Sequence, residues 1–150
     1  MSDALYNTRI LRLAAATAGA ARLVAPHASA VRVSPVCGSK ITADVDLDAD
    51  HRISRFGHEV RACALGQAAA ALVAADVIGR SGAELATARN ALADWLAGRS
   101  EAVPAWPGMD VFAPARPHRA RHASILLGFD AAIDAVRLAA RADPALVNAG

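Results

Sequence analysis

The stretch KITADVDLDADHRISRFGHEVR, residues 40–61, decides the fold of this chain of 150 residues. In its first part, apolar residues such as Ile41 and Val45 alternate with polar ones, which is the period of a half-buried strand. We therefore expect strands over residues 40–48 and 53–61, joined by a tight turn. A shorter alternating run before them, around residues 31–33, predicts a third strand. Three consecutive strands with short links indicate an antiparallel meander.

The segments on either side of this meander have helical periodicity or turn signals. Alanine supplies most of the apolar content, and it favours helices and close helix packing. We expect a first helix from residue 3 to about 21, capped by Ser2 or Asp3, and a second over residues 65–78. A third helix should begin at a capping box at residues 81–84, and the last should run from about residues 122–124 until Pro144. Between them, residues 102–117 are rich in proline and predict a loop with one short helical turn.

The sequence thus predicts one α+β domain over residues 1–150, in which a three-stranded antiparallel sheet packs against several helices. The core is expected over about residues 5–140, followed by a frayed C-terminal tail.

Composition excludes several functional classes. Aromatic residues make up only 4% of the chain and the net charge is +2, which argues against nucleic-acid binding. The longest uncharged central run, residues 62–75, is too short to span a bilayer. The first residues lack the pattern of a signal peptide, so we expect a cytoplasmic protein without membrane contact.

Three residues at junctions between elements are candidates for chemistry. Cys37 lies in the turn between the first two strands, and Cys63 lies where the third strand meets the following helix. A helix N-terminus carries partial positive charge and free N–H groups, which favour a thiolate. His122 opens the last helix, and a neutral imidazole is a good ligand for zinc or iron. Alternatively, the cysteines are small buried hydrophobic residues and the histidine is a solvated cap. The spacing does not show that the three junctions meet.

Two further polar groups are interpreted as structural. Asp44, Asp46 and Asp48 alternate along the second strand, so we expect them on its solvated face, and they lack the glycine and glutamate of a calcium loop. The group at residues 57–59 is interpreted as one strand face.

Three short motifs, in this order, resemble the IscU/NifU-like iron–sulfur cluster scaffold family, especially its SufU-type branch. They are VCGS at residues 36–39, RACALGQA at residues 61–68 and RHASIL at residues 121–126. The resemblance covers about residues 5–140. It implies a three-stranded antiparallel sheet packed on helices, with three cysteines at one end that hold a nascent [2Fe–2S] cluster or a zinc ion.

This resemblance implies which residues form the site. Cys37 and Cys63 match the first two cysteines, and His122 matches a histidine that precedes the third in part of the family. Ser39 stands where the family has an aspartate, and Ala123 stands where it has the third cysteine. The fourth ligand would come from His58, water or a partner protein. A site with fewer thiolates should bind iron less tightly and lose a cluster sooner.

The function implied is that of a non-enzymatic scaffold or carrier. It would accept iron and sulfur, the latter from a cysteine desulfurase, and pass a transient [2Fe–2S] cluster to recipient apoproteins. One alternative is a zinc-dependent sulfurtransferase, in which Cys63 accepts a persulfide while Cys37 helps to hold the zinc. Another is a metal-free pseudo-scaffold that only binds partners. The oligomeric state is left open.

Overall fold

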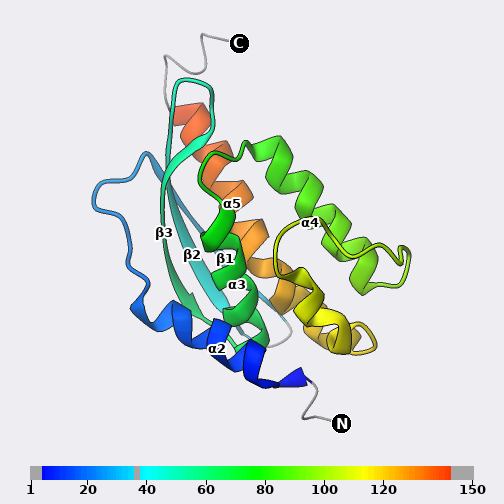
Figure 1. The fold of residues 1–150 in the computed structure, drawn as a ribbon. Helices are drawn as coiled ribbons and strands as arrows, with labels where there is room; N and C mark the ends of the chain where they lie inside the picture. The colour runs from blue at the N-terminus through cyan, green and yellow to red at the C-terminus, as the bar shows by residue number, and fades with distance from the viewer. Residues whose placement is uncertain (1–4, 36–37, 143–150) are drawn as a thin grey trace.

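A computed structural model describes residues 5–35 and 38–142 of the chain (Figure 1). The strands are β1 (Ala28–Val33), β2 (Lys40–Leu47) and β3 (Ile53–Arg61), the α-helices are α2 (Thr8–Ala16), α3 (Ala64–Asp76), α4 (Gly82–Leu96) and α5 (His122–Ala142), and the 3-10 helices are η1 (Thr17–Gly19), η2 (Met109–Ala115) and η3 (Arg119–Arg121).

The sheet is an antiparallel meander in the order β1-β2-β3, as the alternation predicts. Ala30 pairs with Ala43, which in turn pairs with His58, so these residues share the inner face of the sheet. The β2 strand therefore lies in the middle, and every residue from Ile41 to Val45 is buried. The predicted α+β class is confirmed.

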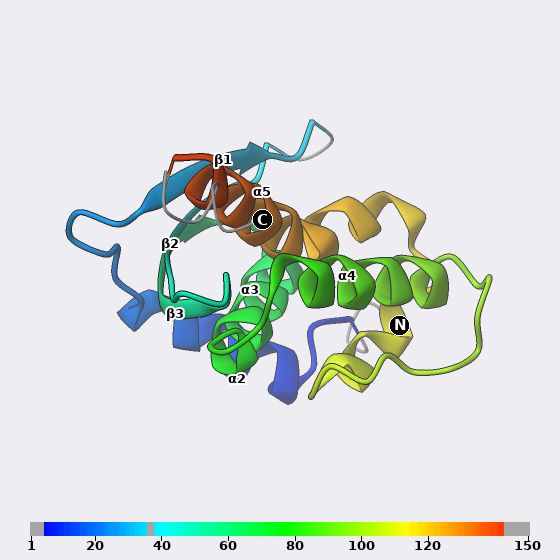
Figure 2. The ribbon, with the colours of Figure 1, turned by 90° about the horizontal axis from the view of Figure 1, so that it is seen from above.

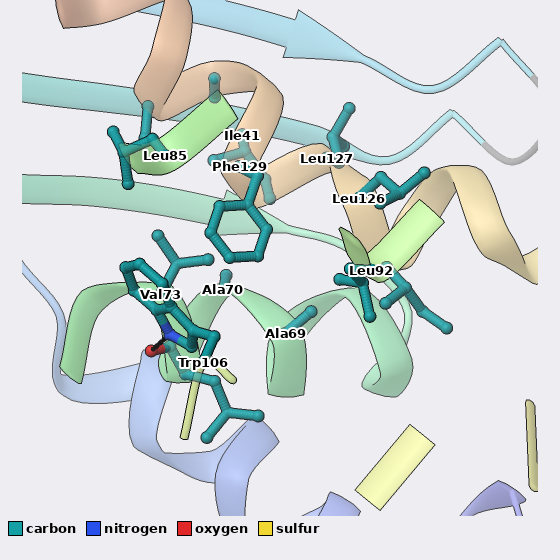
Figure 3. Packing of buried hydrophobic residues seen from close by; sticks show 14 of the residues in the cluster. Ile41, Ala69, Ala70, Val73, Leu85, Leu92, Trp106, Leu126, Leu127 and Phe129 are labelled. Carbon is teal, nitrogen blue, oxygen red and sulfur yellow. Dashed lines mark hydrogen bonds between the residues drawn. The ribbon is translucent and has the colours of Figure 1, made fainter. Parts of the chain in front are cut away.

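The helices cover the inner face of the sheet and build most of the core (Figures 1 and 2). The α5 helix crosses β1 and β2, α3 packs between α2 and α5, and α4 packs against α5. Phe129 of α5 lies fully buried at the centre, in an edge-to-face contact with Trp106 whose ring centroids are 5.0 Å apart (Figure 3). The Trp106 indole N–H donates to the carbonyl of Leu72 (2.8 Å), so its polar end is satisfied.

The start of the first helix differs from the prediction. The described α2 helix begins at Thr8, where the Asn7 side chain accepts a hydrogen bond from the Ile10 amide (3.0 Å). Asparagine is among the best N-cap residues. Ser2 and Asp3, the predicted caps, lie outside the described residues, as do Pro144 and the predicted frayed tail.

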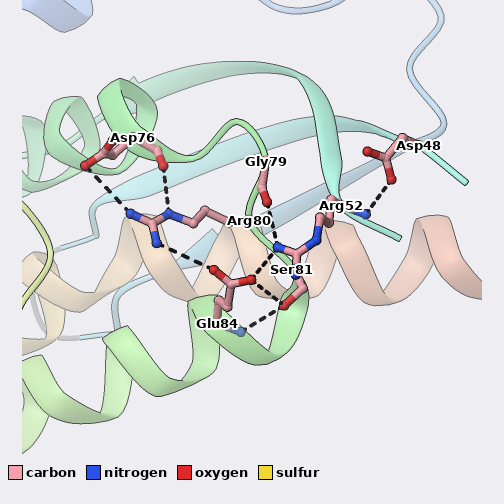
Figure 4. Close-up of polar contacts among 7 residues, drawn as sticks. All are labelled: Asp48, Arg52, Asp76, Gly79, Arg80, Ser81 and Glu84. Carbon is pink, nitrogen blue, oxygen red and sulfur yellow. Dashed lines mark hydrogen bonds and ion pairs between the residues drawn. The ribbon is translucent and has the colours of Figure 1, made fainter. Parts of the chain in front are cut away.

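A polar network joins the turn after β2 to the turn between α3 and α4 (Figure 4). Arg52 donates to the Gly79 carbonyl (2.8 Å) and pairs with Glu84. The Ser81 hydroxyl accepts from the Glu84 amide (3.2 Å), as the predicted capping box requires. The Glu84 carboxylate pairs with Arg52 and Arg80, and this holds the start of α4 against the turn after β2.

None of the described helices is long and apolar enough to cross a membrane.

Asp44 corrects the prediction of a solvated face. Its carboxylate is fully buried, because residues 21–23 cross the outer face of the sheet. It accepts hydrogen bonds from Arg22 (2.7 and 2.9 Å), the Ser29 hydroxyl (2.5 Å) and the Leu23 amide (3.0 Å). Burial raises the pKa of Asp44, but these donors outweigh it and the pKa lies below its ordinary value.

We expect Asp44 to make folding dependent on acid pH. Because its pKa is lower in the folded chain than in the unfolded chain, its stabilisation is full at neutral pH. It is lost as the pH falls below about 4 and through the folded pKa. Asp44→Asn should lower the free energy of unfolding at pH 7 by about 1.5–3 kcal/mol, the usual value of hydrogen bonds to a charged group. Urea unfolding between pH 7 and pH 3 measures the pH dependence and the effect of the substitution. If the difference in free energy of unfolding between wild type and Asp44→Asn were the same at pH 7 and pH 3, this role would be contradicted.

Candidate functional site

One end of the sheet gathers the chain segments that carry the predicted site. Val33 at the end of β1 pairs with Lys40 at the start of β2, and Lys40 pairs with Arg61 at the end of β3. The turn at residues 34–39 and Cys63 therefore leave the sheet at the same end. The turn is closed by the Ser34 amide, which donates to the Ser39 carbonyl (2.7 Å).

The starts of α3 and α5 lie against each other at this end. A Cβ atom on Gly66 would lie 3.3 Å from the Ser124 carbonyl oxygen and 3.6 Å from the Ser124 Cβ. One turn further along both helices, a Cβ atom on Gly128 would lie 3.2 Å from the Ala70 Cα. The two helices therefore run in the same direction in close contact, and both N-termini face the same end of the domain. Sequence spacing leaves this convergence open, and the structure supplies it.

Cys63 is the N-cap residue of α3. Its backbone has the extended conformation usual at this position, and its side chain makes no capping hydrogen bond. The side chain is partly buried. The thiol thus lies beside the free N–H groups of the first helical turn, which favour negative charge. Cys37 lies outside the described residues, so its side chain is not placed.

His122 is the first residue of α5, and its ring orientation is fixed by backbone carbonyls. Its Nε2 atom lies 3.0 Å from the Ala115 oxygen and 3.1 Å from the Arg116 oxygen. Both oxygens can only accept, so Nε2 carries the hydrogen and donates. In the neutral ring this leaves the lone pair on Nδ1. Metal-binding histidines commonly have this arrangement, with one nitrogen donating to a carbonyl and the other free to bind.

Ser34 is a site-end residue that the sequence did not single out. Within the described ranges, its hydroxyl is the one buried side-chain oxygen or nitrogen without a hydrogen-bond partner. It lies three residues before Cys37 in the sequence. Ser39 is also buried, at 5% exposure. Gly66 was missed as well, although a glycine inside a helical pattern signals a close packing contact.

His58 lies away from this end. It pairs with Ala43, three residues before Arg61 along β3, and its buried ring contacts Phe56 edge to face with centroids 5.4 Å apart. Burial lowers the pKa of His58, although the Asp44 charge opposes this. No group of three histidine, cysteine or acidic side chains that could hold a metal occurs in the part of the chain described here, which does not include Cys37.

Comparison with solved structures identifies the family. A crystal structure of a nitrogen-fixing NifU-like protein (N-terminal) from Brucella abortus matches with a TM-score of 0.85 and 39% sequence identity. The match covers 93% of this chain and 96% of that chain. The chain belongs to the NifU-like family. The family resemblance expected from the sequence is thereby confirmed.

Two more distant structures share the fold of this NifU-like chain. One is described as an iron–sulfur cluster assembly scaffold protein for the SUF system from Fervidobacterium islandicum AW-1, with a TM-score of 0.74 and coverage of 91% of this chain and 99% of that one. The other is a hypothetical protein with a TM-score of 0.75 and coverage of 90% and 98%. Both are 17% identical to this chain, which shows the fold alone. No protein-family model and no curated protein matches the chain.

Proposed function

We propose that this protein is a scaffold or carrier in iron–sulfur cluster assembly. It receives sulfur from a cysteine desulfurase, binds iron, holds a transient [2Fe–2S] cluster and passes it to recipient apoproteins. The observation that carries the proposal is the contact between the starts of α3 and α5, which brings the Cys63 and His122 junctions to one end of a NifU-like fold. The cytoplasmic location remains a prediction.

The donor set of the proposed site is Cys37, Cys63 and His122. Thiolate and neutral imidazole are suitable ligands for iron in such clusters. The hydrogen bonds from His122 Nε2 support its role, since they leave Nδ1 as the binding nitrogen. The unpartnered Ser34 hydroxyl supports a negatively charged cargo nearby, because a sulfide or thiolate sulfur would accept its hydrogen.

The fourth ligand does not come from His58 in this proposal. That ring is buried against Phe56 on the inner face of the sheet, three residues back from its end. The fourth position is instead left to water or to a group from a partner protein. An incomplete protein ligand set suits a carrier, because a cluster held by fewer thiolates is released more easily.

Anaerobic loading with iron(III) and sulfide, which supplies the oxidation states of a [2Fe–2S] cluster without a further oxidant, tests the function. We expect bound iron and sulfide in equal amounts, with visible charge-transfer absorption. Protein that retains neither iron nor colour would contradict the scaffold, and retention of zinc alone would favour the sulfurtransferase alternative.

Ala123→Cys provides a matched gain of function, since it restores a thiolate beside His122. Changes in the outer partners of metal ligands alter affinity by about 10–100-fold, so we expect an added ligand to slow cluster loss to a chelator by at least about tenfold. Leu138→Cys adds a thiol far along the same helix and serves as the control. Equal rates of loss in the two variants would argue against a site at the start of α5.

A further inference from the structure

The β1 strand has an open edge that faces a groove. A hollow of about 440 Å³ lies between β1 and the second half of α5 and is lined by Ser29, Ala30 and Val31 from the strand and by Asp134, Arg137, Leu138 and Arg141 from the helix. Figure 2 shows β1 at the outer edge of the sheet with α5 alongside.

The direction of the backbone groups along β1 follows from the register. The Ser34 amide bonds to Ser39, which continues the pairing of Val33 with Lys40. In an antiparallel pair, bonded and non-bonded residues alternate. The N–H and C=O groups of Ser29, Val31 and Val33 therefore point away from β2. No described residue bonds to these groups, so the edge offers unpaired donors and acceptors.

The opposite edge of the sheet, along β3, is covered by another segment of the chain. There the His58 amide donates to the Ala21 carbonyl (3.3 Å), and residues 21–23 cover the strand. Proteins usually blunt an exposed edge with a covering segment, a charge, a proline or a bulge, because an open edge pairs with other chains. The paired residues of β1 include no proline and no bulge, and their one charge, Arg32, is turned to Asp134 of α5. The strand exposes Val31 and Val33 at 52% and 54%.

The groove also has a definite charge. Asp134 is paired with Arg32 at 2.5 Å, which neutralises it. Arg137 and Arg141 form no ion pair with any described carboxylate, so the helical wall is cationic, with the partly exposed Leu138 between them. A groove between an edge strand and a helix is a known docking place for an extended peptide, which binds through main-chain hydrogen bonds.

We propose that this groove binds an extended, acidic and apolar segment of a partner protein, which adds a strand to the sheet beside β1. The free edge of β1 gives main-chain hydrogen bonds. On the outer face, Val31 and Val33 contact the apolar side chains of the added strand, and on the α5 side Arg137 and Arg141 pair with its carboxylates. The groove lies at the start of β1 and along the second half of α5, away from the candidate site at the other end of these elements. The inference does not depend on the proposed cluster chemistry.

The probe is a capped peptide of alternating glutamate and valine, added to the full chain and followed by amide NMR and hydrogen exchange. We expect the amides of Ser29, Val31 and Val33 to exchange more than about tenfold more slowly at saturation, since each gains a bond. A lysine–valine peptide should not bind. The proposal would be overturned if the amides that slow down lie elsewhere in the chain, if both peptides bind equally well, or if neither peptide binds. So would slow exchange at these amides before peptide is added, which would show that this chain itself occupies the groove.

Two sets of variants separate the contacts. Val31→Pro removes an N–H that the native ladder does not use, so the fold should remain while binding is lost. Val31→Thr keeps that N–H and should still bind. The double variant Arg137→Glu, Arg141→Glu should weaken binding by roughly tenfold or more through charge reversal. Arg12→Glu, an exposed change on α2, is the charge control. Binding that persists in Val31→Pro would exclude strand addition.

Discussion

Cys63→Ser is expected to abolish cluster retention while leaving the domain as stable as before or more so. Serine replaces the thiolate with a poorer ligand for iron, so the cluster should be lost at least about 100-fold faster, at the upper end of the effects seen for changes around metal ligands. Because residue 63 is the N-cap of α3, the same substitution is expected to raise the stability of the fold. The Cys63 side chain makes no capping bond, whereas serine is a favoured N-cap.

The serine hydroxyl can accept an amide hydrogen from the first turn of α3, and we expect a gain of about 0.5–1 kcal/mol in the free energy of unfolding. Chelator-challenge kinetics and urea unfolding on the same variant measure the two effects separately. A variant that is destabilised and loses its cluster would point to a structural role for the thiol. A variant that keeps its cluster at the wild-type rate would remove Cys63 from the ligand set.

Phe129→Ala is expected to be the most destabilising single change in the core. The ring is fully buried and contacts Trp106 edge to face, between α3, α4 and the sheet (Figure 3). Removing a buried phenylalanine costs about 3–5 kcal/mol, because apolar contacts are lost and a cavity remains. The aromatic pair adds about 0.5–1.5 kcal/mol of its own.

Urea unfolding followed by circular dichroism tests this expectation. Leu138→Ala, a change of an exposed side chain on the same helix, should shift the free energy by no more than about 0.5 kcal/mol. A loss below about 1 kcal/mol for Phe129→Ala would show that the core collapses around the missing ring.

Local patterns predicted the sheet and most of the helices. The alternation in residues 40–61 fixed the two long strands, and Ser81 marked the start of α4, because both signals lie within a few neighbouring residues. The start of α5 at His122 was likewise confirmed.

What the sequence could not predict depends on segments that meet across the fold. Asp44 was assigned to a solvated face because nothing near it in sequence shows that residues 21–23 fold over it. The contact of Gly66 with Ser124, and the two carbonyls that orient His122, depend on how α5 and η2 pack. The role of Cys37 stays a prediction, since it lies outside the described residues.

The close packing of α3 on α5 separates the frame of the domain from the identity of its donor groups. The backbones are locked together at Gly66 and Gly128, inside the helices, whereas positions 63 and 123 lie at or beside their N-termini. Protein engineers can therefore exchange donors at positions 63 and 123 without touching the contacts at Gly66 and Gly128. Substitutions at these positions are therefore expected to change how long a bound cluster is retained, while the packing of α3 on α5 stays the same.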